Sequence, residues 1–323
     1  MRVRIAVIAL CAAAVGVVAA CKPAGKQEPS RPALSFAFDL WAGYFPAAVA
    51  KGSGIYDSLG VNVELRRPEN TKEILSDFAS GRHDLIGVSF ADVVTLSNSL
   101  PELRVVMCSD ESAGADAVVA QRNIRSVRDL RGKRLGVALG GFAELFVTRV
   151  LQARGVDPKS VEFIEADASA VPALLAKDSI DAGETWEPYL SGAVAHGARR
   201  LFSTADTPGL IVDCVATRTD VLARRGDEVR RFVAGWFLGL DRWNADSAGS
   251  RRLIAATLRI PETDASSTGV KLLTLAENRR RFAAGDSDSF SRVAETYSAF
   301  FARAGALRAP FKGSAVLTNE YLP

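Results

Sequence analysis

The sequence predicts an α/β protein in two blocks with mostly parallel sheets. Three observations lead to this prediction. From Leu34 onward short apolar segments alternate with helical ones, the alternation starts again in a second block, and the pattern after Asp220 is purely helical. Strands separated by helices pair mainly in parallel, with helices covering both faces of the sheet. The 323 residues suffice for two ordinary domains.

The first block contains four predicted strands. Pro46 favours the start of the first helix, and Asn70 with Glu73 has the spacing of a capping box. The predicted strands are residues 33–40, 61–65, 84–89 and 104–108, and helices are predicted from residues 46, 70 and 90.

The second block and the C-terminal part follow the same logic. The predicted strands are residues 115–120, 134–139, 161–166, 180–186 and 211–217, with helices from Ser126 and over 142–154, 171–177 and 187–196. Further helices are predicted over 227–244, 247–257, 266–277 and 289–304. Ligands of such sheets bind at the carboxyl ends of the strands. This rule points to residues 39–44, 89–92, 140–142 and 184–187.

The N-terminus has the pattern of an export signal. A basic start precedes an apolar run of sixteen residues from Ile5 to Ala20, shorter than the roughly 20 residues of a membrane-spanning helix. Val18–Cys21 is similar to the lipobox of bacterial lipoproteins. We therefore predict a signal peptide over residues 1–20, lipidation at Cys21 and a flexible tether over 21–33. The protein would be exported to the periplasmic or cell-surface side of a bacterial membrane and anchored there by lipid. An ordinary signal peptide cleaved after Ala20 is the alternative.

Charge and residue counts exclude several classes of function. Without Arg2 and Arg4, 38 basic residues face 37 acidic ones, and no basic run is long enough for nucleic-acid binding. With only two histidines and no C-x-x-C pair, we predict no metal site, no cofactor and no Ser-His-Asp triad. Cys108 and Cys214 lie on predicted strands, and two alternatives stay open for them: a disulfide formed after export, or two core thiols.

A glycine pair follows the strand over residues 134–139. The segment "GVALGG" is followed by neither the Lys nor the Ser/Thr of a P-loop, and its glycines miss the dinucleotide-binding spacing. Binding of NTP or NAD is therefore disfavoured. The loop either offers backbone N–H groups to a ligand or simply permits a tight turn.

Several segments, in order between residues 34 and 222, carry a family resemblance. They include "LWAGYFPAAVA", "SAGADAVVA", "DLRGKRLGVALGG", "IDAGETWEPYL" and "GLIVDCVATRTDVL". The chain resembles the substrate-binding components of the nitrate/sulfonate/taurine class of bacterial ABC importers, which share their fold with thiamine-precursor-binding proteins. The resemblance implies a type II periplasmic-binding-protein fold, in which two α/β lobes joined by two hinge strands close on a small-molecule solute and deliver it to an ABC permease. Lobe 1 would comprise residues 34–118 and 218–323, and lobe 2 residues 119–217. We expect a monomer.

The resemblance also implies a set of ligand-binding positions. These are Trp41, Tyr44, Ser89, Phe90, Asp116, Gly140, Gly141, Phe142, Glu184, Trp186, Glu187 and Asp213. Relatives that bind oxyanions often have Ser or Thr after the DL-x-G-K strand, where this chain has Gly-Gly-Phe, and none of the positions is Arg or Lys. An acidic and aromatic cleft suits a cationic or neutral nitrogen-containing solute. The alternatives are that some aromatics are core residues, that Glu187 only starts a helix, and that the ligand is a sulfonate or nitrate.

Two other functions remain as alternatives. An enzyme of the pyrimidine-precursor or futalosine type would share the fold, but the synthase needs a Cys-rich, His-containing site that the sequence lacks. A sensor domain would need a transmembrane helix and an output module. The sequence therefore predicts a binding protein and not an enzyme.

Overall fold

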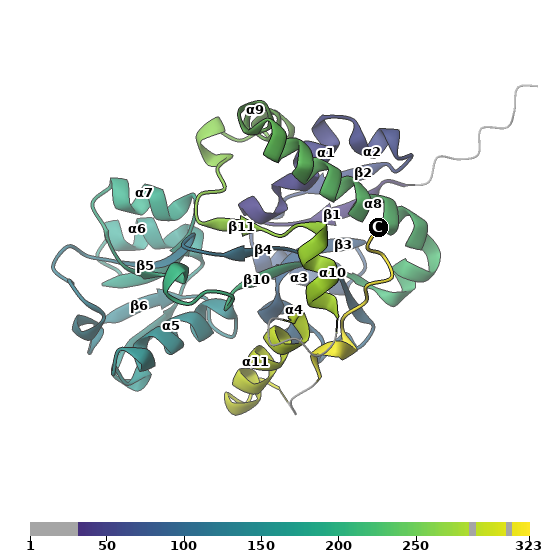
Figure 1. Cartoon of the computed structure of the whole chain (residues 1–323). Helices are drawn as coiled ribbons and strands as arrows, with labels where there is room; N and C mark the ends of the chain where they lie inside the picture. The colour runs from purple at the N-terminus through teal and green to yellow at the C-terminus, as the bar shows by residue number, and fades with distance from the viewer. Residues whose placement is uncertain (1–31, 284–288, 308–311) are drawn as a thin grey trace, which may run out of the picture. The chain divides into compact units, whose positions relative to one another are not determined.

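The structure is a computed structural model that describes residues 32–283, 289–307 and 312–323. The predicted signal peptide, Cys21 and nearly all of the predicted tether lie outside the described residues. Residues Ala33–Pro323 form one unit by their internal contacts, and everything below concerns this unit (Figure 1). In the described part of the chain, no helix is both long and apolar enough to cross a membrane.

Two separate sheets form the centres of two lobes. The first has the strand order β11-β4-β10-β3-β1-β2 and the second the order β7-β6-β8-β5-β9. The first sheet contains β1 (Leu34–Ala37), β2 (Val63–Arg66), β3 (Leu85–Ser89), β4 (Leu103–Ser112), β10 (Val212–Arg218) and β11 (Val270–Leu272). The second contains β5 (Asp116–Ala120), β6 (Arg134–Val137), β7 (Glu162–Glu165), β8 (Ala182–Trp186) and β9 (Arg199–Ser203). These sheets confirm the predicted two-lobed α/β fold.

Helices flank both sheets (Figure 1). They are α1 (Phe45–Gly52), α2 (Ile55–Ser58), α3 (Thr71–Ala79), α4 (Phe90–Leu96), α5 (Phe142–Ala153), α6 (Val171–Ala176), α7 (Tyr189–Ala195), α8 (Thr219–Ala245), α9 (Ser247–Leu258), α10 (Leu275–Phe282) and α11 (Phe290–Arg303). Their starts follow local chemistry. Asn70 caps α3 by accepting the N–H of Glu73 at 3.0 Å, and Ser89 and Asp92 form a reciprocal capping box at the start of α4.

The prediction of mostly parallel sheets is wrong in detail, because each sheet is mixed. β1 pairs in parallel with β2 and β3, and β6 with β7 and β8. β10 is antiparallel to both β3 and β4, and β5 is antiparallel to both β8 and β9. The reason is topological. β5 and β10 each enter their sheet from the other lobe, whereas the strands beside them run toward that other lobe, so the pairing is antiparallel.

The chain crosses between the sheets twice, at residues 113–115 and 204–211. The predicted ends of lobe 2, at residues 119 and 217, fall inside β5 and β10, a few residues away from the two crossings. A third segment lies beside the first crossing, where the carbonyl of Gly269 accepts the N–H groups of Ala113 and Ala115 at 2.7 and 3.1 Å. Gly269 has a φ of +74°, and a Cβ there would lie 2.5 Å from the nitrogen of Ala115, so only glycine fits.

The sequence missed two short strands. β9 was not predicted, and residues 266–277, predicted as one helix, contain β11 followed by the start of α10. Gly269 interrupts the helical pattern, and three-residue β11 exists through its pairing with β4. Ser126 caps a 3₁₀ turn (Val127–Leu130) in place of an α-helix, and α7 begins two residues later than predicted.

The two cysteines face each other within the first sheet. Cys108 and Cys214 are directly paired across β4 and β10, fully buried, with their Sγ atoms 3.2 Å apart. Both are free thiols in the structure, and burial raises the pKa of each. A disulfide formed between them after export and two core thiols stay open as alternatives.

Candidate functional site

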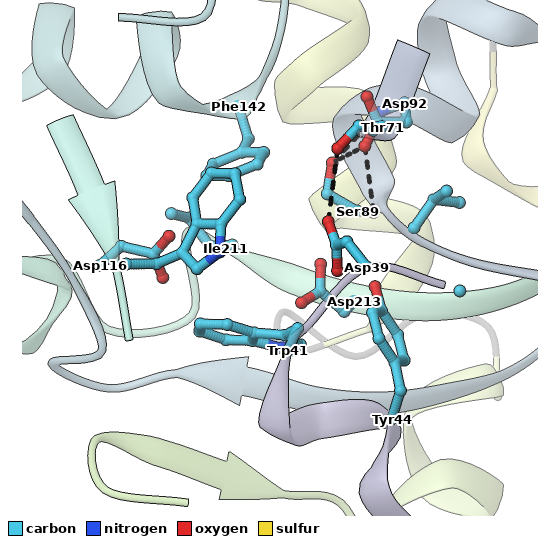
Figure 2. A pocket seen from close by; sticks show the side chains of 13 residues that line it. Asp39, Trp41, Tyr44, Thr71, Ser89, Asp92, Asp116, Phe142, Ile211 and Asp213 are labelled. Atoms are coloured by element: carbon cyan, nitrogen blue, oxygen red, sulfur yellow. Dashed lines mark hydrogen bonds between the residues drawn. The ribbon is translucent and has the colours of Figure 1, made fainter. Parts of the chain in front are cut away.

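A pocket that is partly open to solvent lies where the ends of the two sheets face each other. We call it the inner pocket (Figure 2). Its lining residues are Asp39, Trp41, Tyr44, Thr71, Gly87, Val88, Ser89, Asp92, Asp116, Phe142, Trp186, Ile211 and Asp213.

The turn after β1 places one aromatic wall of the inner pocket. Trp41 donates its indole N–H to Asp110 Oδ1 at 2.9 Å, which fixes the ring. Gly43 makes this contact possible, because a Cβ at that position would lie 1.7 Å from the other oxygen of Asp110. Tyr44 packs against the flat face of β3 at Gly87, where a Cβ would approach the tyrosine ring to 2.7 Å. Lobe 1 therefore holds both rings, that of Trp41 through the Asp110 carboxylate and that of Tyr44 against β3.

Lobe 2 contributes the opposite wall. Asp116 begins β5 and lies directly across from Trp186 on β8, so both side chains are on the same face of the sheet. Phe142 begins α5, and its ring centroid is 5.8 Å from that of Trp186. An acidic residue and two aromatic rings of lobe 2 thus face the aromatic wall of lobe 1.

Carboxylates dominate the electrostatics of the inner pocket. Asp39, Asp92, Asp116 and Asp213 line it, and no Arg, Lys or His is among the lining residues. Burial, and after it the charge of neighbouring carboxylates, raises the pKa of Asp39 and of Asp116 to about 7. The pKa of Asp213 is raised well above its usual value by burial and then by Asp110. Figure 2 shows the carboxyl groups of Asp39, Asp116 and Asp213 directed into the same region.

Several buried acids of this region have carboxyl oxygens without a hydrogen-bond partner among the described residues. Asp39 Oδ1, Asp116 Oδ2 and both carboxyl oxygens of Glu184 are buried and unpartnered. Glu184 lies on β8 diagonally from Asp116, and burial followed by the charge of Asp116 raises its pKa well above the usual value. A buried acceptor without a donor costs about 1–3 kcal/mol. A ligand that brings donors and positive charge would remove this cost.

The structure brings seven of the twelve predicted site residues to the inner pocket. They are Trp41, Tyr44, Ser89, Asp116, Phe142, Trp186 and Asp213. Phe90 is instead a fully buried core residue that packs against Phe290. Glu184 lies one step deeper on the face that Trp186 occupies, and it does not line the pocket. The carboxylate of Glu187 accepts the N–H and hydroxyl of Ser191 in α7, so its observed contact is the helix-start alternative.

The glycine loop does not line the inner pocket either. Its backbone donors are occupied by the chain's own acids: Gly140 N–H donates to Glu144 Oε2 at 2.8 Å, and Leu139 N–H to Glu165 Oε2 at 3.0 Å. Gly140 has a φ of +77°, the conformation that a tight turn requires. These contacts favour the turn alternative for Gly140 and Gly141.

Other residues of the site were not among the predicted positions. Asp39 and Asp92 line the pocket and fall within the ranges indicated by the strand-end rule. The sequence therefore located these regions but did not single out the two residues. Thr71 donates its hydroxyl to Asp39 Oδ2 at 3.3 Å. Asp110, which holds Trp41, follows the point where the fourth strand was predicted to end, and no motif marks it.

A second hollow, the outer compartment, adjoins the inner pocket and shares Asp39, Thr71 and Trp186 with it. Its other lining residues are Leu40, Arg67, Pro68, Glu69, Asn70, Asp167, Ser169 and Tyr189. The sequence predicted a cleft without basic residues. This expectation is wrong for the outer compartment, which Arg67 lines. Across the described ranges, no three His, Cys, Asp or Glu side chains are arranged to hold a metal ion.

The fold and the site define a two-lobed binding protein with a pocket between its lobes. The solved structure of the alkanesulfonate-binding protein SsuA from Xanthomonas axonopodis pv. citri bound to MOPS has the same fold, with a TM-score of 0.73 and 16% identity over 90% of this chain and 99% of that chain. The model of the family described as NMT1/THI5 like matches residues 41–243. The chain belongs to this family.

Curated sequence relatives match this chain over only part of their length. A Brucella abortus (strain 2308) protein named simply as a binding protein is 25% identical over 62% of this chain and 63% of its own length. The taurine-binding periplasmic protein of Escherichia coli (strain K12) is 22% identical over 47% of this chain and 48% of its own length. The match thus spans less than two thirds of these relatives.

Proposed function

We propose that the protein is the extracytoplasmic solute-binding component of an ABC importer and that its solute is a small organic cation or a neutral nitrogen-containing molecule. The observation that carries the proposal is the inner pocket, in which four carboxyl groups meet aromatic rings and no basic side chain. Family membership and the names of the relatives support the importer role.

Charge and shape both favour an organic cation. An ammonium group in the inner pocket gives the unpartnered oxygens of Asp39 and Asp116 the donors they lack, and charge-assisted hydrogen bonds are among the stronger ones. Trp41, Tyr44 and Trp186 line the same pocket, and a cation–π contact with such a ring would add about 0.5–2 kcal/mol. Closure of the two lobes on the ligand would produce the form that a permease recognises.

The alternative is an anionic solute. It is favoured by relatives whose names refer to taurine and alkanesulfonate, and by Arg67 in the outer compartment. In the inner pocket, however, a sulfonate would meet four carboxyl groups and no positive charge. We therefore place the anion second.

A thermal-shift screen separates the two. The full chain, purified in detergent, is heated with small primary amines, aminopyrimidines, taurine, an alkanesulfonate or nitrate. We expect at least one amine or aminopyrimidine to stabilise the protein, by about 2.7 kcal/mol at 100 times its dissociation constant. Stabilisation by a sulfonate or nitrate, with none by any nitrogenous compound, contradicts the cation proposal and leaves the importer role intact.

The same proposal includes export and a lipid anchor at Cys21. Its basis is the Val18–Cys21 element and the polar segment behind it. We expect Cys21→Ala to move the protein out of the membrane fraction, because the acyl chains that would anchor it attach at Cys21. Cys11→Ala is the matched control and should stay membrane-bound. Unchanged membrane attachment and unchanged mobility of the Cys21→Ala protein would exclude the lipid anchor.

An enzymatic role receives no support from the two histidines. His83 is buried with Nε2 3.6 Å from Asp77, and His196 contacts the carbonyl of Gly192 at 2.8 Å. Neither lines the inner pocket or the outer compartment. We therefore propose binding without catalysis, although one relative of 26% identity is named for thiamine biosynthesis.

A further inference from the structure

The outer compartment has acidic groups of its own. Asp167 and Glu69 line it, and Asp39 lies where it joins the inner pocket. Asp167 Oδ1 accepts both the N–H and the hydroxyl of Ser169, at 2.9 and 2.5 Å, so its carboxylate is fixed on the wall. Asp167 also acts electrostatically on its neighbours, because its charge raises the pKa of Asp39 and of Tyr189 after the larger effect of burial.

The two spaces adjoin each other at Trp186 and Asp39. Both residues line the inner pocket as well as the outer compartment. Asp39 Oδ2 accepts the Thr71 hydroxyl, while its Oδ1 is buried without a partner among the described residues. An elongated molecule can therefore extend along Trp186 with its two ends among different carboxylates.

The charges favour a positive group at the outer end as well. Three carboxylates, those of Asp39, Glu69 and Asp167, line the outer compartment against the single guanidinium of Arg67. Asp167 is half-buried whereas Arg67 is exposed, so solvent weakens the field of Arg67 more than that of Asp167. A carboxylate at this end of a ligand would meet net repulsion.

From these contacts we propose that the cleft selects an α,ω-diamine, with one ammonium group in the inner pocket at Asp116 and Asp213 and the other in the outer compartment at Asp167. The inference rests on the proposed function and specifies the class of its solute. The aliphatic chain between the two ammonium groups lies along the ring of Trp186.

Three ligands of one length test this inference. Cadaverine, n-pentylamine and 5-aminopentanoate share a five-carbon chain and differ only in the second end. Calorimetric titration of the full chain should give an affinity for cadaverine at least tenfold higher than for n-pentylamine, and 5-aminopentanoate should bind most weakly. Equal affinities for the diamine and the monoamine, or tighter binding of 5-aminopentanoate, overturn the diamine proposal while the cation proposal survives. Binding of none of the three overturns the diamine proposal, whereas the cation proposal is decided by the thermal-shift screen with other amines and aminopyrimidines.

Two variants assign the outer end to its residues. Asp167→Asn should remove the preference for cadaverine over n-pentylamine, because only the second ammonium group of cadaverine contacts Asp167. Arg67→Ala is the opposite-sign control and should strengthen cadaverine binding. A preference that survives Asp167→Asn contradicts the assignment. If Asp167→Asn does not fold, judged by circular dichroism, the ratio measured on the unaltered chain still decides the proposal.

Discussion

The Asp116→Asn variant is expected to lose cation binding and, at the same time, to be more stable than the unaltered protein when empty. The carboxyl group of Asp116 is 2% exposed, has an unpartnered oxygen and lies near Asp110, Asp39 and Glu184, so its ionised form is costly without a ligand. Asparagine removes the charge and keeps the shape. At pH 8 we expect binding to weaken by at least 100-fold, because truncating one partner of a buried charge pair costs about 2–5 kcal/mol.

The gain in stability should be about 1–3 kcal/mol in the free energy of unfolding, measured by urea denaturation without ligand. Asp57→Asn is the matched control: this exposed aspartate on α2 should change neither the stability nor the binding. A variant at position 116 that is less stable than the unaltered protein would show that Asp116 contributes to the fold, and undiminished binding would show that the carboxylate is not a ligand contact.

The sequence could predict the part of the site that lies at the carboxyl ends of the strands. Trp41, Trp186 and Asp213 lie in motifs or at strand ends, and the rule that ligands bind at the carboxyl ends of strands follows from topology alone. How far a side chain lies below the carboxyl ends of the strands does not follow from topology. Glu184 and Trp186 share one face of β8, but only Trp186 lines the pocket.

Long-range pairing accounts for the remaining differences. Asp110 belongs to the site because β4 extends to Ser112 and because Gly43 leaves room for its carboxylate, two facts separated by more than sixty residues in sequence. β11 is three residues long and pairs with β4, which is far from it in the sequence. The glycine loop has the local pattern of an anion cradle, but its donors are taken by Glu144, four residues further along the chain, and by Glu165, which the pairing of β6 with β7 brings there.

The pH dependence of the empty protein should be opposite to that of ligand binding. Asp39, Asp110 and Asp116 have their pKa raised from 3.8 to about 7 by burial, so between about pH 4 and pH 7 the folded protein holds more protons than the unfolded chain. Stability therefore falls as pH rises through this window. The melting temperature of the empty protein should be higher at pH 5 than at pH 8.

A cation binds the ionised carboxylates, so its affinity should rise over the same window. If binding releases one proton, the association constant increases up to tenfold for each pH unit below about 7 and levels off above it. Alkylamines stay charged throughout, so the slope reports the protein. Calorimetry in buffers of different ionisation enthalpy measures the number of protons released.

Two comparisons isolate the carboxylates as the source of this effect. Burial lowers the pKa of His83, which on its own makes stability rise with pH and so opposes the predicted trend, while His83 lies outside the pocket. Asp116→Asn keeps His83 and removes one carboxylate, so its stability should fall less between pH 5 and pH 8 than that of the unaltered protein. An amine affinity that stays constant or falls from pH 5 to pH 8 would mean that the acids of the inner pocket do not hold the ligand. Protonation of these acids at low pH would then not weaken amine binding.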